Sequence, residues 1–151
     1  MPSTNPAEPK RKFFTAEEAN KMLPLVKAIV GDIVDQYGSV NTLRERLSAV
    51  PPGRRRTSSD VYTEELAASQ ADLDAQETRL SGLVDELTRL GVELKGPDGL
   101  CDFPSLRDDR PVYLCWRLGE PQVMHWHELN AGVAGRQPLT ASPVKSGRRP
   151  F

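Results

Sequence analysis

Four leucines recur at intervals of seven residues through the middle of the chain: Leu66, Leu73, Leu80 and Leu87. Leu83, Val84 and Leu90 add apolar positions in the second half of this repeat. A seven-residue repeat of this kind is typical of a helix that packs lengthwise against another helix. Gly91 follows at once and is typical of a helix C-terminus. The pattern predicts one long helix over residues 59–90.

The segment before this helix predicts a second helix over residues 13–50. Its apolar face is formed by Val26, Ile29, Ile33, Tyr37, Val40, Leu43 and Leu47, which are spaced by three or four positions. Thr15 and Glu18 form a capping box at its start. Pro24 lies too deep for the first turn, so we expect a kink or restart there. Gly31 and Gly38 suggest close approach of another helix.

The polar loop after Val50-Pro51-Pro52-Gly53 is short, so the two helices should pack antiparallel as a hairpin. After Gly91 the apolar period changes to two, which predicts strands at residues 92–95, 100–103, 112–118 and 123–128. Residues 104–111 and the glycine-rich residues 130–138 are expected to be loops. The predicted fold class is therefore α+β: a long, coiled-coil-like antiparallel helical hairpin followed by a small antiparallel sheet.

Composition favours a single domain over residues 13–139. It is divided into a kinked helix at 13–50, the heptad helix at 59–90 and a β-rich segment at 91–139. Residues 1–12 and 140–151 are polar and lack periodicity, which predicts a disordered tail and a flexible tail. The chain has 151 residues, a length that suits one domain.

Charge and hydropathy limit the cellular compartments and the classes of partner that we expect for this protein. The net charge is −1 and the isoelectric point is about 6.1, whereas proteins dedicated to nucleic acid are usually basic. The basic clusters Lys10-Arg11-Lys12 and Arg54-Arg55-Arg56 are interpreted as solvated loops, so nucleic acid is an unlikely partner. No apolar run is long enough for a membrane span or a secretory signal. We expect a cytoplasmic protein with Cys101 and Cys115 as free thiols.

Several motifs resemble those of a known family. The matching stretches are F-T-A-E-E-A-N-K-M-L-P from Phe14, G-V-E-L-K from Gly91, D-F-P from Asp102, C-W-R-L-G-E from Cys115 and W-H-E-L-N-A-G-V-A-G-R-Q-P-L from Trp126. The chain resembles a small bacterial family catalogued only as a domain of unknown function. The pattern differs at Asn130, where the family more often has Asp, and at Val133, where it has an aromatic residue. The resemblance implies a bacterial origin and a helical segment before a β-rich one, but no activity.

The only two histidines flank a tryptophan, and they suggest a metal site. On a strand, His125 and His127 point to the same face, and a transition metal could be held by His125, His127 and Glu128. Additional ligands would come from Asp102, Cys101 or Cys115. No catalytic residue is predicted.

The strand pairing decides between a metal site and a structural role for the histidines. If the turn pairs Leu118 with Val123, Trp116 lies opposite His125 on the apolar face. Cys115 then lies on the other face, away from His127. This pairing favours imidazoles that pack beside Trp116 and bond to backbone carbonyls. It disfavours Cys115 and His127 as nucleophile and base.

A wider ligand site is the other possibility in the same segment. The loop from Asn130 to Arg136 contains two glycines, and its N–H groups together with Arg136 could bind a small anion. The alternative is a tight loop in which Arg136 pairs with Glu128 or Asp102. Trp116 and Trp126 would form either core or the floor of a pocket. The predicted ligand-binding residues are Trp116, Trp126, His127, Glu128 and Arg136.

Two functions from different classes follow. The first is a non-catalytic interaction or assembly module, a homodimer in which a second hairpin buries the outer apolar positions. The second is a metal- or ligand-binding protein with a transition metal, haem or a small anion at the His/Glu/Arg cluster.

Overall fold

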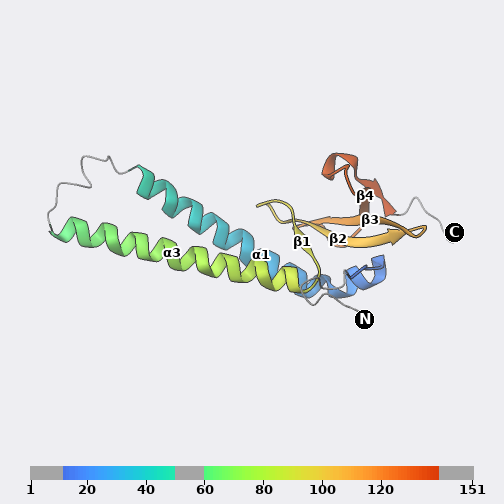
Figure 1. The fold of residues 1–151 in the computed structure, drawn as a ribbon, viewed down its shortest axis with the longest axis horizontal. Helices are drawn as coiled ribbons and strands as arrows, with labels where there is room; N and C mark the ends of the chain where they lie inside the picture. The colour runs from blue at the N-terminus through green and yellow to red at the C-terminus, as the bar shows by residue number, and fades with distance from the viewer. Residues whose placement is uncertain (1–11, 50–59, 140–151) are drawn as a thin grey trace, which may run out of the picture.

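The computed structural model describes residues 12–49 and 60–139, and it contains two helices followed by an antiparallel sheet (Figure 1). In chain order the elements are α1 (Ala16–Ser48), α3 (Asp60–Arg89), β1 (Glu93–Leu94), β2 (Leu100–Arg107), β3 (Arg110–Arg117), β4 (His125–Glu128), the 3-10 turn η1 (Val133–Gly135) and β5 (Gln137–Pro138). The predicted α+β class is confirmed. Apart from Lys12, both predicted tails lie outside the described residues, as does the arginine cluster at 54–56. Within the described chain, none of the helices is long and apolar enough to cross a membrane.

α1 begins where the capping box predicts. The Thr15 hydroxyl accepts from the Glu18 N–H at 3.0 Å, and the Thr15 N–H donates to the Glu18 carboxylate at 2.9 Å. Of the expected kink or restart at Pro24, the restart is wrong, because α1 runs unbroken through this proline. A proline inside a helix costs about 3 kcal/mol. Burying one large apolar side chain stabilises a fold by roughly 1.5–3 kcal/mol. Leu23 and Val26 are both buried beside the proline, so their burial offsets its cost.

The end of α3 also follows its sequence signal. Gly91 adopts a left-handed φ of 92°. Its N–H donates to the Thr88 carbonyl at 2.9 Å, and the Val92 N–H donates to the Leu87 carbonyl at 3.3 Å. These two bonds are the Schellman arrangement that ends many helices at glycine. They turn the chain from α3 directly into β1.

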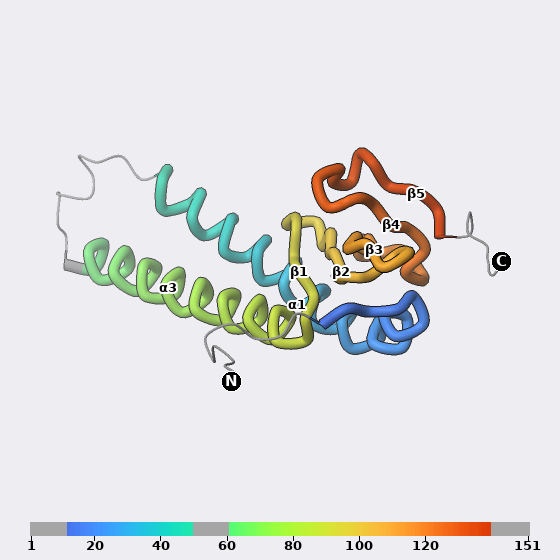
Figure 2. The backbone as a smooth tube through the Cα atoms, turned by 45° about the vertical axis from the view of Figure 1, so that its right-hand side comes forward, coloured from blue at the N-terminus to red at the C-terminus, as the bar shows by residue number. Residues whose placement is uncertain are grey.

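The sheet packs against only one end of the hairpin, as Figures 1 and 2 both show. The first half of α1 supplies most of the helical core: Ala19, Leu23, Val26, Ile29, Val30 and Ile33. In the half that extends beyond the sheet, only Val40 and Leu73 are buried among the described residues. Tyr37, which the pattern places on the packed face, is 37% exposed. Within the described chain no other element approaches Gly31 or Gly38 closely, because a Cβ at either would meet nothing within 4 Å.

The five strands form a sequential antiparallel meander in the order β1-β2-β3-β4-β5. The predicted loop at 104–111 is wrong, because β2 and β3 continue to a tight turn at Asp108 and Asp109. These residues have φ values of 53° and 62°. Such a mirror-image turn usually needs glycine or asparagine, and aspartate tolerates it. β5, within the predicted glycine-rich loop, was not expected.

The register of β3 and β4 differs by one residue from the expected pairing. Cys115 lies opposite His125 and Leu114 lies opposite Trp126, so Trp116 is not the partner of His125. The Leu118 N–H donates instead to the Gly99 carbonyl at 3.0 Å. The side chain of Asn20 in α1 holds Val123 through hydrogen bonds of 2.7 and 3.3 Å. A shift of one residue reverses the face to which each side chain points.

The apolar face of the sheet is joined to α1 near the helix start. Phe14 and Phe103 pack edge to face with ring centroids 5.3 Å apart. The Phe14 N–H donates to the Pro104 carbonyl at 2.7 Å, and the Ser105 hydroxyl donates to the Phe14 carbonyl at 2.5 Å. β2 therefore holds the segment before α1 by both apolar and polar contacts.

Two glycine-to-alanine substitutions should have opposite effects on stability. Gly31→Ala should raise the free energy of unfolding by up to about 1 kcal/mol, because an open helical position gains propensity. Gly99 has a φ of 90°, and its Cβ would lie 2.7 Å from the Leu118 Cβ. Gly99→Ala should therefore lower the free energy of unfolding by roughly 1–3 kcal/mol. Urea denaturation of both variants measures these changes, and equal effects would contradict the described packing.

Candidate functional site

One face of the sheet is polar, although much of it is buried. Phe103, Leu114, Trp116 and Trp126 point toward α1 and the core. Since side chains alternate along a strand, the neighbours of these residues point to the other face. The cross-strand pairs on that face are Glu93 with Asp102, Asp102 with Cys115, Cys115 with His125, and Tyr113 with His127.

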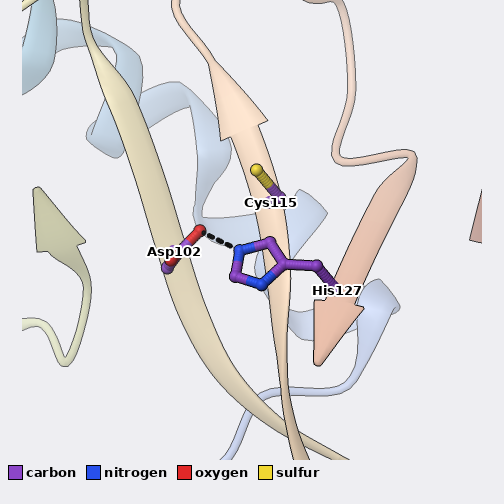
Figure 3. Close-up of side chains that lie close together, drawn as sticks. All are labelled: Asp102, Cys115 and His127. Carbon is purple, nitrogen blue, oxygen red and sulfur yellow. Dashed lines mark hydrogen bonds and ion pairs between the residues drawn. The ribbon is translucent and has the colours of Figure 1, made fainter. Parts of the chain in front are cut away.

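Three of these side chains lie close together, as Figure 3 shows. Asp102, Cys115 and His127 come from β2, β3 and β4, and they are 4%, 0% and 2% exposed. His127 Nε2 lies 3.1 Å from Asp102 Oδ1. One ligand atom of each residue lies within 4.8 Å of the other two. We call these three residues the Asp-Cys-His cluster.

The orientation of the His127 ring is fixed by the hydrogen bond that its other nitrogen, Nδ1, makes. Nδ1 lies 2.7 Å from the Glu128 carbonyl oxygen. A carbonyl oxygen can only accept, so we assign the proton to Nδ1. In the neutral ring, Nε2 then directs a lone pair at the Asp102 carboxylate. This contact is favourable only when a proton or a cation lies between the two atoms.

The thiol of Cys115 is held in its neutral form. Burial raises the pKa of Cys115 to about 11, and the negative charge of Asp102 adds to this effect while Arg136 opposes it. Burial likewise raises the pKa of Cys101 to about 12. Both residues are free cysteines, as predicted. The predicted placement of Cys115 and His127 on opposite faces is wrong, but a raised thiol pKa still disfavours a nucleophilic role.

Of the residues predicted to bind metal, His125 and His127 lie on the polar face, whereas Glu128 points to the other face. His125 shares the polar face with Cys115 but is only half-buried. No hydrogen-bond partner for its Nδ1 is found among the described residues. Glu128 lies opposite Val112 and forms an ion pair with Arg110. The structure thus groups His127 with Asp102 and Cys115, and it places Glu128 elsewhere.

The predicted ligand-binding residues are also divided between the two faces. Trp116 is buried in the core, and its indole N–H donates to the Glu120 carbonyl at 2.9 Å. Trp126 is also buried, and the Arg107 guanidinium lies 4.4 Å from its ring centroid. These two tryptophans and Glu128 do not meet the side chain of His127.

Arg136 binds a partner that the sequence analysis did not suggest. Its guanidinium donates to Glu120 Oε1 at 2.7 Å and to the Cys115 carbonyl at 3.3 Å. The predicted pairing with Glu128 or Asp102 is therefore wrong. Glu120 lies between β3 and β4, and the signal in the sequence that includes it is the C-W-R-L-G-E motif.

The loop before Arg136 uses its own N–H groups. The Ala131 N–H donates to the Glu128 carbonyl at 3.1 Å, the Gly135 N–H to the Gly132 carbonyl at 3.0 Å, and the Arg136 N–H to the Val133 carbonyl at 3.2 Å. These three amides are engaged within the segment. They do not converge on a common point for an anion.

A different feature lies between the helices, beyond the sheet. A groove of about 530 Å³ is lined by Asp35, Gly38, Ser39, Thr42, Leu43, Arg46, Asp72 and Gln76. A smaller hollow of about 280 Å³ is lined by Leu47, Leu66, Ala67 and Gln70. The groove mixes small, apolar and charged residues, whereas the smaller hollow is lined by apolar residues and one glutamine.

The pair of Glu120 and Arg136 should make stability depend on pH. Burial opposes ionisation of Glu120, but hydrogen bonds from Arg136 and from the Arg117 N–H together lower its pKa below 4.5. A lowered pKa means that the stabilisation is complete above about pH 4.5 and is lost as pH falls through the folded-state pKa. Glu120→Gln should cost roughly 1–3 kcal/mol at pH 7 and much less at pH 3. Urea denaturation at both values tests this, and a pH-independent difference would contradict it.

Comparison with known proteins places the chain in a family but assigns it no activity. Neither a curated protein nor a solved structure matches the chain. One family model matches residues 12–139, which include both helices and the whole sheet. The chain therefore belongs to the family described as "Uncharacterized conserved protein (DUF2203)".

Proposed function

We propose that this protein is a non-catalytic assembly module that forms a homodimer through the outer half of its helical hairpin. We define the outer half as residues 34–48 of α1 and 61–76 of α3. The observation that carries the proposal is the uneven burial along the hairpin. The heptad helix and its partner continue well beyond the sheet, as Figure 1 shows, yet they bury little there.

The outer half retains apolar side chains that its own chain does not bury. Leu43 and Leu66 are half-buried, and Tyr37 is 37% exposed. Two helices alone cover only part of each other's apolar face, whereas four helices cover all of it. Burying these side chains against a partner would stabilise the assembly by about 25 cal/mol for each Å² of apolar area removed from water.

The groove suits a helix from a second copy. Gly38 and Ser39 line it, and small residues allow two helix backbones to approach closely. A Cβ added at Gly38 would meet nothing within 4 Å, so the space lies on the outer surface. A two-fold interface must be complementary to itself, and this groove presents both Arg46 and Asp72.

Charge along the two helices supports the same arrangement. Residues 61–77 of α3 include five acidic residues and no basic residue: Glu64, Glu65, Asp72, Asp74 and Glu77. Near the end of α1, Arg44 already pairs with Glu77 of its own chain, whereas Arg46 lines the groove. Placing α1 of one copy against α3 of the other brings opposite charges together, which favours a specific register.

The cytoplasm remains the proposed compartment. Both cysteines are free and buried, which suits a reducing environment. The assembly would therefore require no disulfide.

A matched pair of substitutions tests the interface. Gly38→Gln places a long side chain in the groove, whereas Gly82→Gln makes the same change in α3 outside the groove. Glutamine favours a helix more than glycine does, so neither variant should lose helical structure. We expect the natural protein to be a dimer at micromolar concentration, and Gly38→Gln to weaken it by about tenfold or more. Gly82→Gln should leave the dimer unchanged.

Light scattering and sedimentation equilibrium provide the masses, and circular dichroism checks the helices. A monodisperse monomer of the natural protein at these concentrations would contradict the assembly proposal. A dimer that is unaffected by Gly38→Gln would show that this groove is not the interface.

A further inference from the structure

We propose that Asp102, Cys115 and His127 bind a single divalent transition-metal ion of the zinc, cobalt or ferrous iron class. This site lies within the sheet, away from the outer half of the hairpin, so it is independent of the assembly proposal. Of the three ligands that the sequence suggested first, this site keeps only His127 and excludes His125 and Glu128. Its carboxylate and thiol come from Asp102 and Cys115, two of the additional ligands considered there.

The distances suit one ion. The three candidate ligand atoms lie within 4.8 Å of one another, and His127 Nε2 is 3.1 Å from Asp102 Oδ1. Bond lengths of about 2.0–2.3 Å in a tetrahedral zinc site place ligand atoms roughly 3.3–3.8 Å apart. Small rotations of side chains that already point at one another would reach this geometry (Figure 3).

The chemistry of the ligands selects the class of metal. A thiolate and an imidazole are ligands for zinc, cobalt and iron, whereas calcium and magnesium prefer sites made only of oxygen. A carboxylate and a thiolate together carry two negative charges, which one divalent cation neutralises. That balance matters because all three side chains are 4% exposed or less, and buried charge without compensation is costly. Such close burial suits a single ion rather than haem.

The surroundings of His127 resemble those of a metal ligand. Its Nδ1 is engaged by the Glu128 carbonyl at 2.7 Å, so Nε2 is the nitrogen turned toward Asp102 and Cys115. Histidine ligands commonly donate their other ring N–H to a carbonyl or carboxylate, which fixes the ring. The three side chains stand on three adjacent hydrogen-bonded strands. The backbone therefore positions the ligands before an ion binds.

The competing explanation is a purely structural pair of Asp102 and His127 beside an inert thiol. Both explanations account for the 3.1 Å contact, so stability measurements on variants do not separate them. Direct binding of a spectroscopically active ion does. Cobalt(II) is a suitable probe because a thiolate ligand adds a charge-transfer band to its absorption.

The experiment titrates the full chain, reduced and freed of metal with a chelator, with cobalt(II). We expect saturation at one ion per chain and a thiolate-to-cobalt band. Cys115→Ser should remove the band and weaken binding by about 10–100-fold or more. Cys101→Ser is the matched control, because Cys101 is equally buried on the neighbouring strand but points to the opposite face. The control should keep both the band and the affinity.

Asp102→Asn provides a second variant in case Cys115→Ser does not fold. It keeps a hydrogen-bonding group beside His127 but removes the charge, so it should weaken cobalt binding by about 10–100-fold while the band persists at saturation. Absence of saturable binding by the folded natural protein would overturn the proposal. Equal loss of the band in Cys101→Ser, or unchanged binding in both Cys115→Ser and Asp102→Asn, would also overturn it.

Discussion

The packing of the sheet's apolar face against the first half of α1 is the constraint on which the rest of the structure depends. Phe14 and Phe103 join the two layers by an edge-to-face contact, and Trp116 lies fully buried in the same core. Because side chains alternate along a strand, the residues buried on one face determine which residues lie on the opposite face. Once Phe103, Leu114 and Trp126 point inward, Asp102, Cys115 and His127 can only point to the opposite face.

That opposite face is polar but poorly accessible to water, and this combination is energetically expensive. A buried carboxylate and imidazole gain Coulomb energy from each other, but desolvation offsets much of the gain. Apolar residues of similar size would pack there at least as well. A bound cation would provide the compensation that a carboxylate and a thiolate both require.

Further polar contacts close the edges of this face. Tyr113 donates to the Glu93 carboxylate at 3.2 Å, and Lys95 lies 2.9 Å from Glu93. On the other side, Arg136 joins Glu120 to the backbone of Cys115. These contacts hold β1 and the segment before β5 against the strands that carry the Asp-Cys-His cluster. Among the residues that the structure describes, the hairpin's outer half makes no comparable contact with the sheet, so the two proposals concern separate parts of the molecule.

Local signals in the sequence determined most of the elements. The leucine repeat, the Thr15 and Glu18 capping box and Gly91 each act within one or two helical turns, and the structure confirms all three. The α+β class followed from the change of apolar period after Gly91. The expected restart at Pro24 does not occur, because the local cost of the proline is outweighed by burial against the sheet, which lies far away in the sequence.

Only the tertiary structure decided which side chains meet. The register of β3 and β4 depends on Asn20, which holds Val123 from a distance of about a hundred residues in the chain. The partner of Arg136 depends on how residues 118–124 fold back over β3. A shift of one residue in that register exchanges the two faces, so the Asp-Cys-His cluster could not be derived from spacing. Helix ends are set by bonds between near neighbours, whereas a site on a sheet is set by contacts between distant segments.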